Sequence, residues 1–535
     1  MGVTIQLAVL TAAVALFFFL RGLSSKKTLA PLPPGPPKKP LIGNLLDLPG
    51  AGQQEWIHWL KHKDLYGPLS SVSVFGQNII LINDKRIAYE ILEKNSAKHS
   101  SRPHFTFAEQ ICGWDRAPVN QDNNAFLKTF RRAAARTIGT QASIAKYDRL
   151  IEDEMRHFLW RVLDNPKKFI DHNRSAAVGL ILKITYGYTT EPSKEDPLVA
   201  LADLTLQQFS EAIIPGAFLV DLIPALIYIP EWFPGGGFKT IGRFYYDTLR
   251  RLVESPFAFT KYQKSQNISK NPSLVSELLD QGEDDDLVKW LAVGLYGGGA
   301  DTTVSTMEAF FLAMLLYPEV QGKAQAELDH VLGETTLPTV ADRPKLPYIN
   351  AIVRELLRWH PVAPLGVPHR ADEDDIINGF LIPKNAVLIA NIWGFNHDPE
   401  VYSNPSQFKP ERFLGVDDKD AVPDSQSFGF GRRICPGRLF ADTSLYIMVA
   451  HTLSVFNLNK AVGEDGREID VEAKFTAGII SHPEPFSCAF TPRSESHKQL
   501  IEEFQRENPF KKGNADELLA ALNERNVSHN DGRAS

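Results

Sequence analysis

One stretch near the C-terminal end constrains this chain more than any other: residues 428–437 read FGFGRRICPG. Its three glycines let the backbone turn sharply and lie close to a flat ligand. Cys435 sits in this turn, and an apolar helical pattern follows from Leu439 to Phe456. Backbone amides at the start of a helix favour the thiolate form of a nearby cysteine. The stretch therefore predicts either a ligating cysteine in a tight loop or a simple turn with a structural cysteine.

Length and composition narrow the class of protein. The chain has 535 residues with 43% apolar content, which one large α-rich enzyme fold can fill. A net charge of -7 argues against general nucleic-acid binding. Three cysteines give no disulfide framework. Cys112 and Cys488 lie among apolar residues and are predicted to be core residues, which leaves Cys435 for chemistry.

The N-terminal segment predicts a membrane anchor. Residues 2–20 carry no charge, are mostly apolar and approach the length that a helix needs to cross a bilayer. Basic residues follow at Arg21, Lys26 and Lys27, and none precedes the apolar run. This pattern favours a retained signal anchor over a cleaved signal peptide. The basic flank predicts that the rest of the chain is cytosolic.

The order of segments divides the chain into four parts. We predict a transmembrane signal anchor over residues 1–22, a basic and proline-rich linker over 23–40, a main domain over 41–495 and a charged tail over 496–535. The proline-rich segment should be stiff and non-helical. The tail reads as a peripheral helix followed by disorder. The main domain is predicted to be mainly α-helical with a smaller β-rich region, which includes a hairpin formed by residues 70–74 and 79–82.

A second unusual stretch, GGGADTT at residues 297–303, lies inside a predicted helix from Leu287 to Leu316. Each glycine inside a helix costs roughly 1 kcal/mol relative to alanine. The three glycines therefore indicate that a flat group lies against this backbone or that the helix opens a groove, unless they only allow a kink for packing. Asp301 and Thr302 then place a carboxylate and a hydroxyl at that point.

A third pattern pairs Glu355 with Arg358 on one face of a helix. The apolar neighbours indicate burial, and a buried ion pair needs further partners. Arg412, in the sequence KPERF, is predicted to be that partner.

These motifs, in this order and spacing, resemble the cytochrome P450 family, and several stretches are similar to those of fungal, microsomal members in secondary metabolism. The resemblance implies the cytochrome P450 fold with haem b as cofactor and Cys435 as the iron ligand. It also implies that Thr302 hydrogen-bonds oxygen and that Asp301 helps to relay protons. The cofactor-binding residues that we predict are Cys435, Arg433, Phe428, His369, Arg131, Gly298 and Gly437. The family's tryptophan position four residues before Arg131 is Leu127 here.

The resemblance implies a monooxygenase that inserts one oxygen atom from O2 into a small apolar organic substrate. Electrons are expected from a separate NADPH–cytochrome P450 reductase, because this sequence shows no flavin or nicotinamide domain. The expected location is the endoplasmic reticulum membrane, crossed once, with the catalytic domain cytosolic. Two alternatives stay open: a haem-thiolate isomerase or dehydratase that needs no reductase, and a membrane-anchored haem- or ligand-binding protein without catalysis. NADPH dependence of turnover separates the first from a monooxygenase, and ligand-stimulated NADPH use separates the second.

Overall fold

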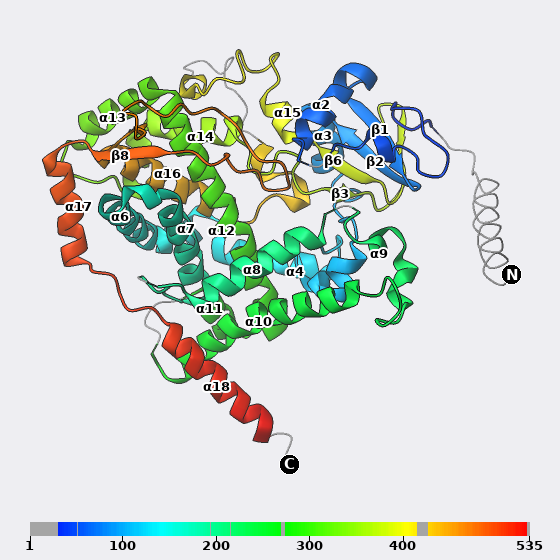
Figure 1. Cartoon of the computed structure of the whole chain (residues 1–535), viewed down its shortest axis with the longest axis horizontal. Helices are drawn as coiled ribbons and strands as arrows, with labels where there is room; N and C mark the ends of the chain where they lie inside the picture. The colour runs from blue at the N-terminus through cyan, green and yellow to red at the C-terminus, as the bar shows by residue number, and fades with distance from the viewer. Residues whose placement is uncertain are drawn as a thin grey trace.

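Helix α12 (Asp285–Leu316) runs through the centre of the molecule, and the other large helices gather around it (Figure 1). The computed structural model describes residues 30–50, 52–192, 194–214, 216–268, 273–414 and 426–531. The side chain of Asp284 caps the helix by accepting hydrogen bonds from the amides of Asp286 and Leu287, both at 3.1 Å. The predicted helix from Leu287 to Leu316 is confirmed, and it is an α-helix throughout.

The described chain is mainly helical, as predicted, and its other α-helices pack on or beside α12 or lie at the periphery. In chain order they are α2 Glu55–Tyr66, α3 Lys85–Ala88, α4 Ala125–Ile138, α5 Gln141–Ile144, α6 Asp148–Asp164, α7 Phe169–Tyr186, α8 Pro197–Ala212, α9 Leu219–Leu222, α10 Phe238–Ser265, α11 Leu274–Asp280, α13 Pro318–Leu332, α14 Pro347–Trp359, α15 Ile392–Asn396, α16 Arg438–Val455, α17 Glu495–Glu507 and α18 Ala515–Asp531.

The β-rich region lies at one end of the molecule, beside α2 and α15 (Figure 1). Its strands are β1 Leu69–Val74, β2 Gln77–Ile82, β3 His369–Arg370, β4 Asp375–Ile377, β5 Phe380–Ile382 and β6 Val387–Ala390. The main sheet has the order β1-β2-β6-β3, in which β2 and β6 run parallel. A separate pair, β7 Phe456–Lys460 and β8 Cys488–Pro492, lies in the helical body.

The predicted hairpin is confirmed, but its turn is two residues shorter than the sequence indicated, because β2 begins at Gln77 instead of Ile79. β1 and β2 pair antiparallel, and Val74 lies opposite Gln77. The turn is therefore Phe75-Gly76, and both residues have positive φ, at 47° and 85°. This backbone conformation suits a two-residue hairpin turn, and it frees the following two residues to join the strand.

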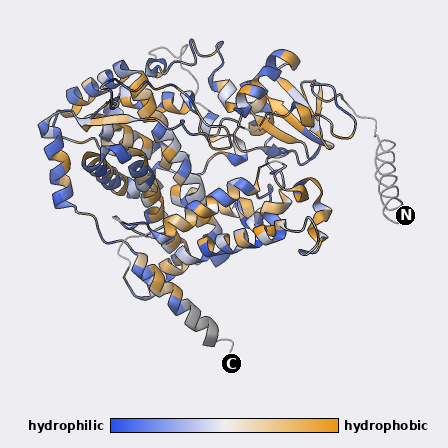
Figure 2. Cartoon of the chain, in the orientation of Figure 1, coloured by the Kyte–Doolittle hydropathy of each residue, from blue (hydrophilic) through white to orange (hydrophobic). Residues whose placement is uncertain are grey.

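The main core lies where α12 meets α6, α7, α14 and α16. Its largest fully buried apolar side chains include Phe158, Phe310 and Phe311. Figure 2 shows hydrophobic residues along these central helices, whereas the peripheral α17 is mostly hydrophilic. Cys112 and Cys488 are both buried, which confirms the prediction that they are core residues.

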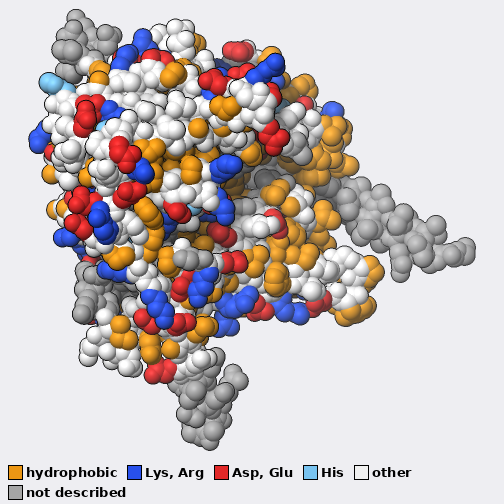
Figure 3. Space-filling model, turned by 60° about the vertical axis from the view of Figure 1, so that its left-hand side comes forward, with side chains coloured by type: hydrophobic (Ala, Val, Ile, Leu, Met, Phe, Trp, Pro, Cys, Tyr) orange, Lys and Arg blue, Asp and Glu red, His pale blue; other side chains and the backbone are white. Residues whose placement is uncertain are grey.

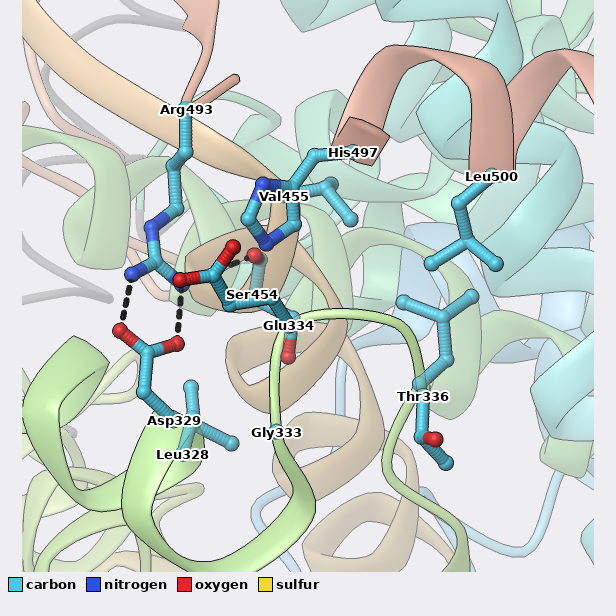
Figure 4. A pocket seen from close by; sticks show the side chains of 11 residues that line it. Leu328, Asp329, Gly333, Glu334, Thr336, Ser454, Val455, Arg493, His497 and Leu500 are labelled. Atoms are coloured by element: carbon cyan, nitrogen blue, oxygen red, sulfur yellow. Dashed lines mark hydrogen bonds and ion pairs between the residues drawn. The ribbon is translucent and has the colours of Figure 1, made fainter. Parts of the chain in front are cut away.

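The C-terminal tail differs from the expected single helix with a disordered end, because it contains two helices. Arg493 precedes α17 and forms an ion pair with Asp329 at 2.5 Å, in the small pocket drawn in Figure 4. α18 packs against α10, and its Leu518 is buried there. Apolar contacts at intervals along the tail therefore hold it to the helical body despite its many charges.

The predicted anchor, residues 1–22, lies outside the described residues. Within the described part, no helix combines the length and apolar character needed to span a bilayer. The described end of the predicted linker lies along the sheet: the carbonyl of Pro34 accepts from the amide of Ser71 at 2.8 Å, and that of Pro31 from the amide of Leu381 at 2.7 Å. This part of the linker is therefore non-helical, as predicted, and is bonded to two strands.

Candidate active site

The loop before α16 is closed by its own backbone. The amide of Cys435 donates to the carbonyl of Phe428 at 2.8 Å. Gly431 has φ of +49°, and a Cβ built on it would lie 2.5 Å from the carbonyl oxygen of Leu92. Only glycine fits there, because any side chain would collide with that backbone. The amide of Gly431 also donates to the carboxylate of Glu93 at 2.5 Å, which fixes the loop against the β-rich end.

Cys435 lies at the start of α16, with the amide of Gly437 directed at it. Burial raises the pKa of the Cys435 thiol, and this outweighs the opposing effects of the Gly437 amide and the positive charges of Arg131 and Arg438. The predicted amide contact is therefore present, but alone it does not make the thiolate stable. Coordination of a metal cation deprotonates a thiol outright, so the loop suits a metal-bound thiolate.

Arg433 and Arg131 are both held at the Cys435 loop. Arg131, on α4, donates to the carbonyl of Ile434 at 2.8 Å. Leu127, one turn earlier, is buried and offers no hydrogen bond there. The guanidinium of Arg433 donates to three backbone carbonyls, those of Ser100, Pro118 and Gln121. Burial, with repulsion from Arg131 added, lowers the pKa of Arg433 to about 10.

Arg102 is a third arginine at this site, it is buried like Arg433, and no sequence motif indicated it. It donates to the carbonyls of Val367 and Pro368, at 2.6 and 2.7 Å, and its Nε has no hydrogen-bond partner. Burial, followed by the charges of Arg433 and Arg131, holds its pKa well below the usual range. The predicted His369, on β3, is also buried beside these cations, and its Nδ1 lies 2.6 Å from the carbonyl oxygen of His99.

This arrangement fits the two propionates of haem b. Within the described residues, no carboxylate forms an ion pair with Arg102, Arg131 or Arg433. Asp122 and Asp372 act on Arg433 by their charge without forming an ion pair with it. Buried charges are normally paired, so guanidiniums without an ion-pair partner are suited to an anionic ligand. Three guanidiniums beside the Cys435 loop can hold two carboxylates of one flat ligand by charge-assisted hydrogen bonds.

The three glycines of α12 have different surroundings. A Cβ on Gly299 would lie 3.0 Å from Ile181 of α7, so this glycine allows close helix packing. A Cβ on Gly298 would meet nothing within 4 Å, and Gly298 is exposed although the helix is otherwise largely buried. The space beside Gly298 is therefore open, although α12 is a continuous helix at this point.

That open face is connected to the cysteine loop through Pro118. The ring of Pro118 lies 3.4 Å from a Cβ built on Gly294, one turn before Gly298. Its carbonyl accepts from Arg433. The structure thus brings the predicted residues of α12 and of the Cys435 loop to a common segment, although they are far apart in the sequence.

Thr302 follows Gly298 by one helical turn, and its hydroxyl donates to the Gly298 carbonyl at 2.7 Å. Thr303 does the same to Gly299, also at 2.7 Å. In this position the Thr302 hydroxyl can accept a hydrogen bond, and it must rotate away from the helix to donate one to another group.

Asp301 lies between two basic side chains that the sequence analysis did not find. Its Oδ2 is 3.3 Å from Nε2 of His482, and its Oδ1 is 3.5 Å from Nη2 of Arg174. Burial would raise the pKa of Asp301, but the hydrogen bond from His482 and the two positive charges lower it. These contacts join residues more than a hundred positions apart, so no local sequence pattern signals them.

The predicted pair of Glu355 and Arg358 is fully buried on α14. Nε and Nη2 of Arg358 bind both carboxylate oxygens of Glu355, at 2.6 and 2.8 Å. Nε of Arg412 joins the same carboxylate at 3.3 Å. The remaining donors of both arginines bind backbone carbonyls. This group of three residues therefore stabilises the structure and is separate from the open face of α12.

An apolar cluster lies beside the N-terminal half of α12. It joins residues from α8, α9 and α10 to the segment before α4, and Phe107 stacks on Phe218 with ring centroids 3.4 Å apart. Trp114 and Val293 lie in the same cluster. Residues from three distant segments, represented by Phe107, Phe209 and Val293, thus meet in space.

The comparisons with known proteins agree with this geometry. The family model described as Cytochrome P450 matches residues 33–490. A cytochrome P450 monooxygenase (claR) of Ampulloclitocybe clavipes is 45% identical over 475 residues, 88% of each chain. Another (ppsD) of Aspergillus oryzae is 44% identical, covering 94% of this chain and 96% of the relative. O-methylsterigmatocystin oxidoreductase of Aspergillus flavus is 40% identical, covering 95% and 96%.

Proposed function

Because this chain belongs to the cytochrome P450 family, we propose that it inserts one oxygen atom from O2 into a small apolar organic substrate. Its class is that of the oxidoreductases, and its cofactor is haem b. The observation that carries the proposal is the Cys435 loop beside three arginines that form no ion pair within the described residues, connected through Pro118 to the open face of α12. Fungal secondary metabolism is the proposed setting, since the relatives are fungal.

Different residues of this chain would have different roles in the reaction. Cys435 would ligate the iron, while Arg102, Arg131 and Arg433 would bind the propionates. Haem b supplies the activation of oxygen. Thr302 follows Gly298 of the open face by one helical turn, and Asp301 precedes Thr302 in the helix. We propose that this hydroxyl and this carboxylate hold and move protons there.

The substrate is proposed to be apolar because the cluster beside α12 is built from aromatic and aliphatic side chains. Such walls exclude water and favour apolar ligands. The binding site would include the segments at 105–114, 209–219, 293–298, 362–367 and 475–480. The last two are joined by the amide of Ser481, which donates to the carbonyl of Val362 at 2.8 Å.

Electrons are proposed to come from NADPH through a separate cytochrome P450 reductase. Lys128 and Arg132 on α4 and Arg432 in the cysteine loop are exposed, and Arg131 joins α4 to that loop. A positive surface there can attract an acidic electron donor and speed its association.

The proposed location is the cytosolic face of the endoplasmic reticulum, with the catalytic domain held by the N-terminal anchor. A described surface supports membrane contact: Leu219, Ile223, Tyr228, Trp232 and Phe233 are all exposed around α9. α9 lies at the same side of the molecule as the start of the described chain, and hydrophobic side chains gather on this side in Figure 3. Exposed apolar patches of this kind mark contact with membranes or other proteins.

The proposal is tested with the full-length holoenzyme, reductase, NADPH and labelled ¹⁸O2. A panel of terpenoid, aromatic and indole compounds is incubated, and products are analysed by mass spectrometry. We expect one product class that gains a single ¹⁸O atom only when NADPH is present. Cys435→Ser should abolish both this product and the strongly red-shifted Soret band of the ferrous carbon monoxide complex, whereas Cys488→Ser should keep both.

Two results would contradict the proposal. Product formation without NADPH and without ¹⁸O would identify an isomerase or dehydratase. Spectral binding of compounds that never stimulates NADPH use would identify a binding protein.

A further inference from the structure

His482 lies between two carboxylates of α12. Its Nδ1 is 2.9 Å from Oε2 of Glu308, and its Nε2 is 3.3 Å from Oδ2 of Asp301. The two acids are seven residues apart, which places them on one face of the helix, two turns from each other. One imidazole ring therefore spans both turns with its two nitrogens.

The loop that carries His482 is fixed without the help of this side chain. The carbonyl of Ser481 accepts from the hydroxyl of Ser305 at 2.5 Å and lies 3.0 Å from Nε2 of His360. Ser305 lies between Asp301 and Glu308 on the same face of α12. Substitution of His482 should therefore leave the loop in place.

Charge favours a protonated ring at this position. Burial opposes the positive charge, but the hydrogen bonds to Asp301 and Glu308 outweigh it and raise the pKa of His482 to about 9. The side chains of His482 and Glu308 are 22% and 9% exposed, so water screens this contact only partly. Arg174 binds the other oxygen of Asp301 and also pairs with Asp203 at 3.6 Å.

We propose that His482 is a positioning residue, whose imidazolium holds the carboxylate of Asp301 in one orientation beside Thr302. Glu308 holds the ring from the far side, and Arg174 holds the second oxygen of Asp301. This inference rests on the proposed function, because it assigns a support to the residues that handle protons there.

A holding role is favoured over proton transfer through the ring. The pKa of His482 is raised and that of Asp301 is lowered. Transfer of the proton from the imidazolium to the carboxylate would therefore run strongly uphill. The raised pKa of His482 and the lowered pKa of Asp301 both agree with a fixed positive charge that keeps Asp301 ionised and oriented.

The first test compares His482→Gln with His482→Arg in the reconstituted holoenzyme. Glutamine removes the charge, and arginine keeps a charge that it cannot release. We expect glutamine to lower the ratio of product formed to NADPH consumed by about tenfold, since small misplacements of catalytic groups have effects of up to about a hundredfold. Arginine should restore most of this ratio.

His330→Gln, at an exposed position of α13, is the matched control and should behave as wild type. Wild-type coupling in His482→Gln would overturn the proposal. The proposal would also be overturned if His482→Arg were as poorly coupled as His482→Gln, because that result would assign proton transfer to the ring. If wild-type enzyme uses no NADPH with any substrate, the proposed function itself has failed.

The second test does not depend on turnover. Histidine-labelled protein is studied by NMR as the diamagnetic ferrous carbon monoxide complex, and the His482 signal is identified by its loss in His482→Gln. The titratable or charged groups that face this ring are Asp301 and Glu308, with Arg174 and His360 beyond them. We expect the ring to stay protonated up to about pH 8 and to lose its proton at lower pH in Glu308→Gln. Titration of wild-type His482 near about 6.5, the ordinary histidine value, would overturn the proposal.

Discussion

Thr302 and Thr303 are adjacent and make the same hydrogen bond to the preceding turn of α12, so they form a natural pair for experiment. Thr302 stands one turn from the open face at Gly298, whereas Thr303 stands one turn from Gly299, which is packed against α7. The same side chain is thus presented to two different surroundings.

We expect Thr302→Ala to bind substrate and carbon monoxide normally but to release more oxygen as hydrogen peroxide. Loss of a positioned proton-handling group lowers a rate typically about a hundredfold or more, so product per NADPH should fall clearly. Thr303→Ala should remain near wild type. The measurement is NADPH consumption against product and peroxide. If coupling were unchanged in Thr302→Ala, the only role left for the Thr302 hydroxyl would be its hydrogen bond to the preceding turn of the helix.

Arg102 should control retention of haem through its charge. Charge-assisted hydrogen bonds contribute about 1.5–3 kcal/mol, so Arg102→Gln should increase the rate of haem loss to an acceptor protein by about tenfold or more. Arg102→Lys keeps the charge and should lose haem more slowly than Arg102→Gln. Equal rates in the two variants would show that the contacts to Val367 and Pro368 matter instead of the charge.

The pKa of His482 also predicts a pH dependence of folding stability. The folded-state pKa, about 9, is above the unfolded value of 6.5. The ring therefore stabilises the fold fully below about pH 6.5, and this contribution, on the order of 3 kcal/mol, is lost as the pH rises through about 9. The difference in urea-unfolding free energy between wild type and His482→Gln should shrink over that range. A difference that grows with pH would contradict the assigned charge.

At the scale of elements, what the sequence could predict was set by the range of each interaction. The extent of α12 and the pairing of Glu355 with Arg358 depend on residues one or two turns apart, and both were predicted. The hairpin turn was predicted two residues too long, because Gln77 and Asn78 also have turn composition but pair within the strand. Arg102 and His482 were missed because their partners lie far away in the chain.

The buried group of Glu355, Arg358 and Arg412 predicts a large effect on stability. Glu355→Gln removes the charge that compensates two buried arginines. Loss of one partner in such a pair costs about 3–5 kcal/mol, so the midpoint of urea unfolding of the holoenzyme should fall strongly.

Glu411→Gln is the matched control from the neighbouring turn. Glu411 pairs with the exposed Lys323 and is itself partly exposed. Exposed pairs contribute about 0–1 kcal/mol. If the two substitutions lowered the midpoint of urea unfolding by similar amounts, Glu355 would contribute no more than an ordinary surface acid.

At the scale of the whole molecule, attachment to the membrane should be separable from haem binding. A chain that starts near Pro31 keeps the linker residues that bond to β1 and β5. We expect it to load haem and to leave the membrane fraction far more than the full chain does. Residual binding should disappear when Trp232 and Phe233 are replaced by serine, since they are exposed near α9. Loss of haem binding on truncation would contradict this separation.

The two C-terminal helices lie beyond residue 490, where the family match ends. A gene trimmed to the matched region would nevertheless lose the ion pair of Arg493 with Asp329 and uncover the face of α10 that α18 covers. Buried side chains such as Leu518 would no longer shield their apolar neighbours. Newly exposed apolar surface promotes association between molecules, so the shortened enzyme should precipitate during production even where its haem pocket is intact.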